Sequence, residues 1–148
     1  MSAPLFRRIL VPYDFSPPAA RALAAAADLA AETGGRIHVL HVIQPVYPPP
    51  EIAAWIPEPN LVPTTRKRLE AAAAKAMKGR KVPVSCRVVV GDPLDRITAA
   101  ARACDSIVMA THGRTGIGRL LIGSVAEKVV RHAPVPVLTL RAGGQRGR

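Results

Sequence analysis

The fold of this chain is decided by the stretch Asp105-Ser106-Ile107-Val108-Met109-Ala110-Thr111-His112-Gly113, followed after a spacer of nine residues by Gly123-Ser124. Its first part is an apolar run typical of a buried strand, and its second part enters a loop that also carries Gly116 and Gly118. The Gly123-Ser124 pair precedes a predicted helix over residues 125–130. Because the first N–H groups of a helix are unpaired and its N-terminus is electropositive, a glycine-bearing turn there favours phosphate binding.

The whole chain has the size and composition of one globular domain. It has 148 residues, of which 49% are hydrophobic, and this is enough to bury a single core without disulfides. Its apolar runs are too short to cross a bilayer and none resembles a signal peptide, so we expect a cytoplasmic protein with no membrane partner. Cys86 and Cys104 lack metal-ligand or redox spacing and are expected to be small buried hydrophobic residues.

The formal net charge of +11 is spread along the sequence. Most arginines stand singly, and short basic clusters occur at residues 66–68, 80–81 and 141–148. Aromatic residues make up 3% of the chain, too few for the base-stacking surface of a nucleic-acid-binding protein. We therefore expect an arginine-rich solvated surface that attracts anions without specifying them, and no specific nucleic-acid partner.

Apolar runs and amphipathic segments alternate along the chain in the order βαβαβαβαβ. Strands are predicted over residues 8–12, 36–42, 84–90, 105–110 and 135–140. Helices are predicted after the caps Ser16 and Asp92, each followed by proline, from about Thr64, and after Gly123-Ser124. Strands this apolar, separated by helices, predict an α/β fold: one doubly wound, five-stranded parallel sheet of order 3-2-1-4-5 with helices on both faces.

Two segments fall outside this pattern. Residues 43–63 hold seven prolines and are predicted to form a loop, which serves as a lid or a partner surface. The ring of Trp55 in this loop either anchors it to the domain or contacts a partner or ligand. Residues 142–148 form a basic tail that is predicted to be disordered, so the domain is expected to span residues 1–141.

A ligand site is predicted where the strand order reverses, at the carboxyl ends of the first and fourth strands. The first strand is followed by Pro12-Tyr13-Asp14-Phe15-Ser16 and the fourth by the glycine loop. Asp14 either bonds its own backbone in a turn or accepts hydrogen bonds from a sugar hydroxyl or base amine. Ser124 is a candidate helix cap, a role that is compatible with contact to a phosphate.

The chemistry-bearing residues favour a binding module over an efficient enzyme. A dinucleotide-binding glycine motif is absent from the first turn, and Ser124 stands where a P-loop would need lysine. No nucleophile–base–acid set, carboxylate pair or metal cluster is apparent, and His112 is interpreted as a loop-packing residue. We expect no catalytic or metal-binding residues and at most a weak ATPase activity.

The chain resembles the universal stress protein family over residues 6–141. The resemblance is carried by the segments 9–16, 39–43, 108–116, 120–127 and 134–138. The ATP-binding branch of that family has the pattern G-x2-G-x9-G-[S/T], which Gly113 and Gly123-Ser124 match while Ala110 replaces the first glycine. The resemblance implies ATP, with a divalent cation such as Mg²⁺, as the ligand of a site that comprises Pro12, Asp14, Val42, Ala110, Gly113, Arg114, Gly123, Ser124 and Val125.

The resemblance leaves two functions open. One is an ATP-binding regulatory protein of the stress response, in which the Ala110 methyl weakens binding if it faces the ribose and is harmless if it faces the sheet. The other is a nucleotide-independent dimeric scaffold that recruits an unknown protein partner through the Pro-rich loop. Family members dimerise through the last strand, so a homodimer through residues 135–140 is expected, and an apolar sheet edge favours such pairing.

Overall fold

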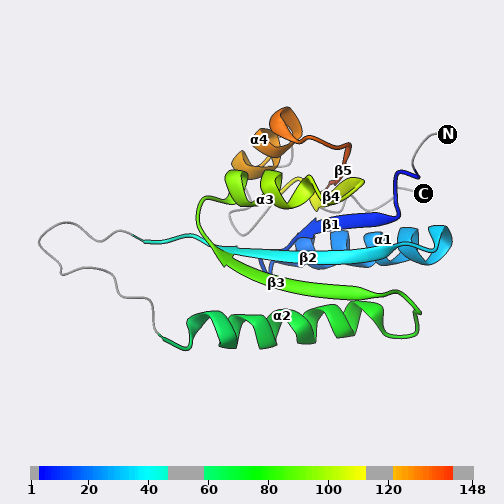
Figure 1. Ribbon diagram of the computed structural model, residues 1–148, viewed down its shortest axis with the longest axis horizontal. Coiled ribbons are helices and arrows are strands. Elements are labelled where there is room, and N and C mark those ends of the chain that lie inside the picture. Colours follow the sequence, from blue (N-terminus) through cyan, green and yellow to red (C-terminus); the bar gives the residue numbers. More distant parts are fainter. Residues whose placement is uncertain (1–3, 47–58, 113–121, 142–148) are drawn as a thin grey trace, which may run out of the picture.

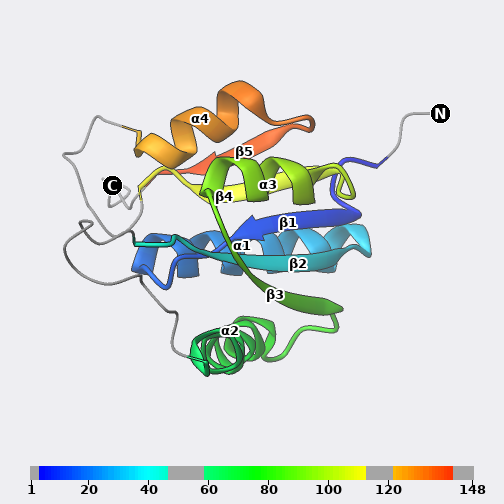
Figure 2. The same cartoon turned by 60° about the vertical axis from the view of Figure 1, so that its left-hand side comes forward.

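In the computed structural model, which describes residues 4–46, 59–112 and 122–141, parallel strands form one five-stranded sheet (Figure 1). The strands are β1 (Arg8–Pro12), β2 (Arg36–Ile43), β3 (Val84–Val90), β4 (Ser106–Ala110) and β5 (Val137–Leu140). Their order is β3-β2-β1-β4-β5, which Figure 2 shows from bottom to top. The predicted order 3-2-1-4-5 is confirmed, and β1 and β4 are the neighbours at the reversal.

Helices cover both faces of the sheet. They are α1 (Pro17–Thr33), α2 (Leu61–Met77), α3 (Pro93–Ala101) and α4 (Ser124–His132). Side chains alternate along each strand, so Ile9 and Val11 of β1 belong to the core with α1 and α2, whereas Leu10 belongs to the core with α3 and α4. The sheet is therefore the middle layer of three, as a doubly wound fold requires (Figures 1 and 2).

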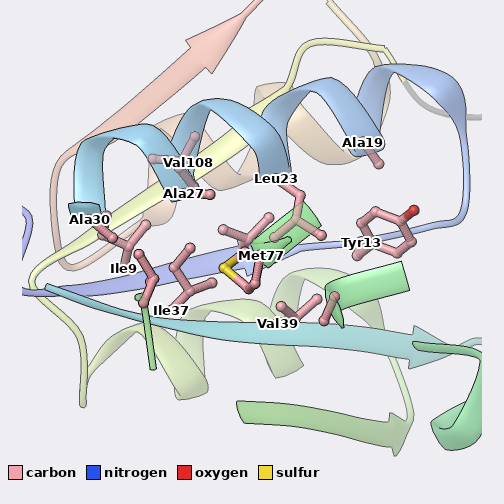
Figure 3. Packing of buried hydrophobic residues seen from close by; sticks show 14 of the residues in the cluster. Ile9, Tyr13, Ala19, Leu23, Ala27, Ala30, Ile37, Val39, Met77 and Val108 are labelled. Atoms are coloured by element: carbon pink, nitrogen blue, oxygen red, sulfur yellow. The ribbon is translucent and has the colours of Figure 1, made fainter. Parts of the chain in front are cut away.

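The core on the α1–α2 side ends at Tyr13. Ala26, Ala27 and Ala30 of α1 are fully buried, and their small side chains let the helix approach the sheet closely. Figure 3 shows Tyr13 beside Ala19 at one end of this cluster, just beyond the end of β1. The hydrophobic core thus extends to the edge of the sheet at which the ligand site was predicted.

Local sequence explains where the helices begin and end. The Ser16 hydroxyl accepts a hydrogen bond from the Ala19 N–H at 3.2 Å, and Gly34 ends α1 with a left-handed φ of 66°. The Asp92 carboxylate accepts from the Asp95 N–H at 3.1 Å and so caps α3. The N-caps Ser16 and Asp92 are those that the sequence predicted.

Some predicted boundaries are wrong by a few residues. Helix α2 begins at Leu61 rather than near Thr64, because Pro63 lies in the first turn, where a helix needs no N–H donor. Gly123, not Ser124, is the cap of α4, and β5 begins at Val137 rather than at residue 135. The two ends of the loop predicted at 43–63 therefore belong to β2 and α2. Trp55 and the predicted tail lie outside the described residues.

An ion pair joins the beginnings of β1 and β4. Asp105 accepts hydrogen bonds from the Arg8 side chain at 2.8 and 3.2 Å and from the Arg8 backbone N–H at 2.8 Å. These bonds hold the pKa of the Asp105 carboxyl below its usual value, although partial burial acts in the opposite direction. Cys86 and Cys104 carry free thiols, the latter buried, and no described helix is long and apolar enough to span a membrane.

Candidate functional site

A pocket with a volume of about 600 Å³ lies at the carboxyl ends of β1, β2 and β4. That volume lies within the usual range for small-molecule sites in proteins. The predicted site residues that line it are Pro12, Asp14, Val42, Ala110, Gly123, Ser124 and Val125. Gly113 and Arg114, the remaining predicted residues, lie outside the described ranges. The fold thus brings together residues from three separate parts of the sequence around one concavity.

The turn after β1 points a carboxylate into this pocket. Asp14 accepts a hydrogen bond from the Ser16 N–H at 3.0 Å through Oδ1, so it does form the predicted turn. Its side chain is half-buried, and among the described residues no cation lies within ion-pair distance of it. The turn-forming and ligand-binding interpretations of Asp14 are therefore compatible, because Oδ2 remains an acceptor.

Phe15, the next residue, has a left-handed backbone with φ of 64°, a conformation that bulky side chains rarely adopt. Its ring lies edge-on to Tyr13 at 5.2 Å and to His41 at 4.9 Å between centroids. His41 Nδ1 lies 2.7 Å from the Tyr13 carbonyl oxygen, which only accepts, so Nδ1 carries the proton. These aromatic contacts fix the turn that positions Asp14.

Val42 presents unpaired backbone groups beyond the end of β1. Along β2, the groups of Leu40 face β1, since the Leu40 carbonyl accepts from the Tyr13 N–H at 2.8 Å. The groups of Val42, two residues later, face the same way, whereas Ile43 accepts from Gly91 on the β3 side. Because β1 ends at Pro12, the Val42 N–H and carbonyl have no hydrogen-bond partner among the described residues. They offer one donor and one acceptor side by side.

The N-terminus of α4 opens on the other side of the pocket. The Gly123 N–H donates to the Thr111 carbonyl, which ties the helix to the end of β4. No side chain caps α4, and Ser124, Val125 and Ala126 of its first turn line the pocket. Their backbone N–H groups have no partner within the helix, so this end is electropositive.

His112 lies in a short hydrogen-bonded chain at the same edge. The Thr111 hydroxyl lies 3.3 Å from the Leu140 carbonyl and 2.9 Å from His112 Nδ1. Because that carbonyl only accepts, the hydroxyl donates to it and accepts from Nδ1–H. His112 Nε2 is buried and has no partner among the described residues. This hydrogen bond holds the ring beside Thr111, and His112 also lines the pocket.

Several lining residues were missed by sequence reasoning. Thr65 and Arg68 come from α2, and Pro93 and Ile97 come from α3. No motif marks them, since they reach the pocket only because both helices start at the carboxyl edge of the sheet. The parallel topology was the available signal, because it puts the first turns of all crossover helices at that edge.

The charges at the pocket act on Tyr13. Burial raises the pKa of the Tyr13 hydroxyl, the Asp14 carboxylate raises it further, and Arg68 lowers it. A negative and a positive side chain therefore both act on this ring. Among the described residues, no group of three or more His, Cys, Asp or Glu side chains is arranged to hold a metal ion.

Comparison with known proteins assigns this arrangement to a family. The model of the universal stress protein family matches residues 5–141. The chain belongs to the universal stress protein family. A universal stress protein of Thermus aquaticus is 38% identical over 143 residues, which cover 93% of this chain and 100% of that protein. A solved family member from Burkholderia pseudomallei is 31% identical with a TM-score of 0.71, over 95% of this chain and 100% of its own.

Two more distant solved structures share the fold and contain ligands. A universal stress protein in complex with cAMP is 23% identical with a TM-score of 0.69, over 91% of this chain and 96% of its own. A universal stress protein from Archaeoglobus fulgidus in complex with dAMP is 22% identical with a TM-score of 0.66, over 92% and 98% of the two chains. At these identities the likeness concerns the fold alone.

Proposed function

We propose that this universal stress protein binds an adenine nucleotide, ATP with Mg²⁺, in the pocket at the carboxyl edge of the sheet. The observation that carries the proposal is that unpaired backbone groups of Val42, the Asp14 carboxylate and the α4 N-terminus line one pocket of about 600 Å³. These groups match the successive parts of a nucleotide: base, sugar and phosphates. The protein would act as a regulatory binding module of the stress response.

The nucleoside would lie over the ends of β1 and β2. Adenine carries a ring-nitrogen acceptor beside the N6 amino donor, and the Val42 N–H and carbonyl are the complementary pair. Asp14 Oδ2 would accept from a ribose hydroxyl, while Oδ1 stays bonded to Ser16. Pro12 and the side chains of Leu40 and Ile97 supply apolar walls for the rings.

The phosphates would lie at the N-terminus of α4. Uncapped N–H groups and a positive helix end suit oxyanions, and Gly123 keeps a side chain away from them. Gly113 and Arg114 would add contacts by the family pattern. Mg²⁺ would enter with the phosphates, because it binds through phosphate oxygens and water rather than through an all-protein cage.

Ala110 replaces a glycine of the pattern but leaves the pocket open. It lies at the end of β4 and lines the pocket. Val108, two residues earlier, belongs to the core with α1, so the alternation of the strand directs the Ala110 methyl to that same face. The phosphate end of the ligand lies toward α4 on the opposite face. This supports the interpretation in which the methyl is tolerated.

Hydrolysis would be slow or absent. Fast phosphoryl transfer needs a residue that orients the attacking water and cations that stabilise the transferring group. Among the described lining residues, Arg68 is the one lysine or arginine, and it comes from α2, on the opposite face of the sheet from the α4 N-terminus. The Asp14 carboxylate is committed to the turn and the sugar. We therefore expect ATP to be a ligand more than a substrate.

Calorimetric titration with ATP and Mg²⁺ tests the proposal. Wild-type protein is expected to bind one nucleotide per chain, and Asp14→Ala is expected to weaken the affinity by at least tenfold, as the loss of a charged acceptor costs about 1.5–3 kcal/mol. Glu32→Gln, an equal change of charge at an exposed position of α1 that does not line the pocket, is the control. Absence of binding at millimolar nucleotide would refute the proposal.

The homodimer is a separate proposal that β5 supports. Within the described residues β5 pairs only with β4, which leaves its other edge open, and Leu138 of β5 and Val130 of α4 are exposed apolar side chains. An open apolar edge favours pairing with a second copy. Leu138→Lys is expected to shift the mass measured by light scattering from dimer to monomer. A wild-type monomer at micromolar concentration would contradict this.

A further inference from the structure

Arg68 is a cation on the α2 side of the pocket, far in sequence from every residue of the family pattern. On α2, Arg68 lies one turn after Thr65, which also lines the pocket. The next residue, Leu69, is fully buried and fixes the orientation of the helix. The Arg68 guanidinium carbon lies 4.1 Å from the centroid of the Phe15 ring. Arg68 lines the pocket although its side chain is exposed.

The stacking on Phe15 leaves the N–H donors of Arg68 available. A guanidinium stacks through its flat face, and its donors point outward in the plane of the group. No described residue accepts a hydrogen bond from Arg68 or forms an ion pair with it. The nearest arginine on α2, Arg66, differs in this respect because it is bonded to Glu70 at 3.1 Å. Arg68 is thus oriented, unpaired within the described chain, and adjacent to the pocket.

In the described part of the chain, the pocket therefore has two positive ends, which come from opposite faces of the sheet. One is the N-terminus of α4, and the other is Arg68 of α2. Asp14 follows the end of β1, and its carboxylate raises the pKa of Tyr13 whereas Arg68 lowers it. A nucleoside held at Asp14 and Val42 would extend its 5′-phosphates toward α4, which leaves Arg68 without an anionic partner among the described residues and the nucleotide.

We propose that Arg68 binds a second phosphate, carried on the 2′ or 3′ oxygen of the ribose, so that the pocket prefers nucleotides phosphorylated at both ends of the sugar. This inference rests on the proposed function. The ribose hydroxyls lie on the opposite side of the sugar from the 5′ carbon, so such a phosphate points away from α4. Planar bidentate recognition of a phosphate is the chemistry at which arginine excels.

The test compares AMP with adenosine 3′,5′-bisphosphate and adenosine 2′,5′-bisphosphate by calorimetry. In the wild-type protein one of the bisphosphates is expected to bind about tenfold more tightly than AMP, the gain of a partly solvated charge-assisted pair. Arg68→Gln is expected to abolish this preference, so that AMP and the two bisphosphates bind the variant with equal affinity. Lys67→Gln, the same change of charge on the exposed preceding residue that does not line the pocket, is expected to retain it.

The outcomes separate the two proposals. Equal affinity of AMP and both bisphosphates for wild-type protein would overturn the role of Arg68 and leave the nucleotide site intact. A preference for a bisphosphate that persists in Arg68→Gln would also overturn it. So would an equal loss of preference in Lys67→Gln and Arg68→Gln, since net charge alone would then explain the effect. If no adenine nucleotide binds the wild-type protein, the proposed function itself fails and this inference fails with it.

Discussion

The left-handed conformation of Phe15 predicts an unusual order of stability among its variants. For a residue with a Cβ atom, this conformation raises the free energy of the folded state by about 1–2 kcal/mol, and for glycine it does not. Phe15→Ala keeps the unfavourable backbone and loses the ring, whereas Phe15→Gly loses the ring and releases the backbone. We therefore expect the glycine variant to be the more stable of the two.

The magnitudes follow from the contacts of the ring. Phe15 has edge-on contacts with Tyr13 and His41, each worth about 0.5–1.5 kcal/mol, and a cation–π contact with Arg68 worth about 0.5–1 kcal/mol at an exposed site. Phe15→Ala is thus expected to lower the free energy of unfolding by about 2–3 kcal/mol. Phe15→Gly is expected to recover about 1 kcal/mol of this loss after the entropy of glycine in the unfolded chain is subtracted.

Urea denaturation followed by circular dichroism measures these differences, provided that the slopes of the transitions agree. Ala71, an exposed residue in the middle of α2, supplies the control, because Ala71→Gly is expected to lower stability by about 1 kcal/mol. A glycine variant of Phe15 that is less stable than the alanine variant would refute the left-handed turn. The turn would then not hold the Asp14 carboxylate in the pocket as described.

Three further changes probe the site and the fold. Asp14→Asn, which retains the Oδ1 acceptor for Ser16, is expected to preserve stability better than Asp14→Ala in thermal melts while both lower ATP affinity; equal melting temperatures would contradict this. Gly123→Val is expected to fold, since φ of −58° suits any residue, but to lose nucleotide affinity at least tenfold in calorimetry because its side chain covers the α4 N–H groups. Asp105 has a lowered pKa in the folded state, so it stabilises the fold above its unfolded pKa and this contribution disappears as the pH falls through the folded value. Asp105→Asn is therefore expected to lower the free energy of unfolding at neutral pH. The difference from wild type is expected to become smaller in acid, and a difference that does not change with pH would contradict the role of the Arg8 pair.

The architecture was predictable because every local signal agreed with the global fold. Each apolar run became a strand, and the caps Ser16 and Asp92 opened helices as their side chains allow. The strand order followed from the reversal that doubly wound sheets need. The errors arose at boundaries, where Pro63 was interpreted as a helix breaker although the first turn of α2 tolerates it.

The site was predictable only in part. Asp14 and Gly123 follow strand ends in the sequence, so topology alone brings them to one edge. The open backbone groups of Val42 depend on the register between β1 and β2, which pairs Pro12 with Leu40 and which the hydrophobic pattern does not encode. Arg68 reaches the pocket through the packing of α2, and the left-handed Phe15 that supports it has no signature in the sequence.

A crystal structure of the protein grown with ATP and Mg²⁺ shows directly whether the pocket at the carboxyl edge of the sheet holds a nucleotide. We predict electron density for one nucleotide, with adenine at the Val42 backbone, the ribose at Asp14 and the phosphates at the first turn of α4. Density for the nucleotide elsewhere on the surface, or a pocket without nucleotide at saturating concentration, would contradict the account.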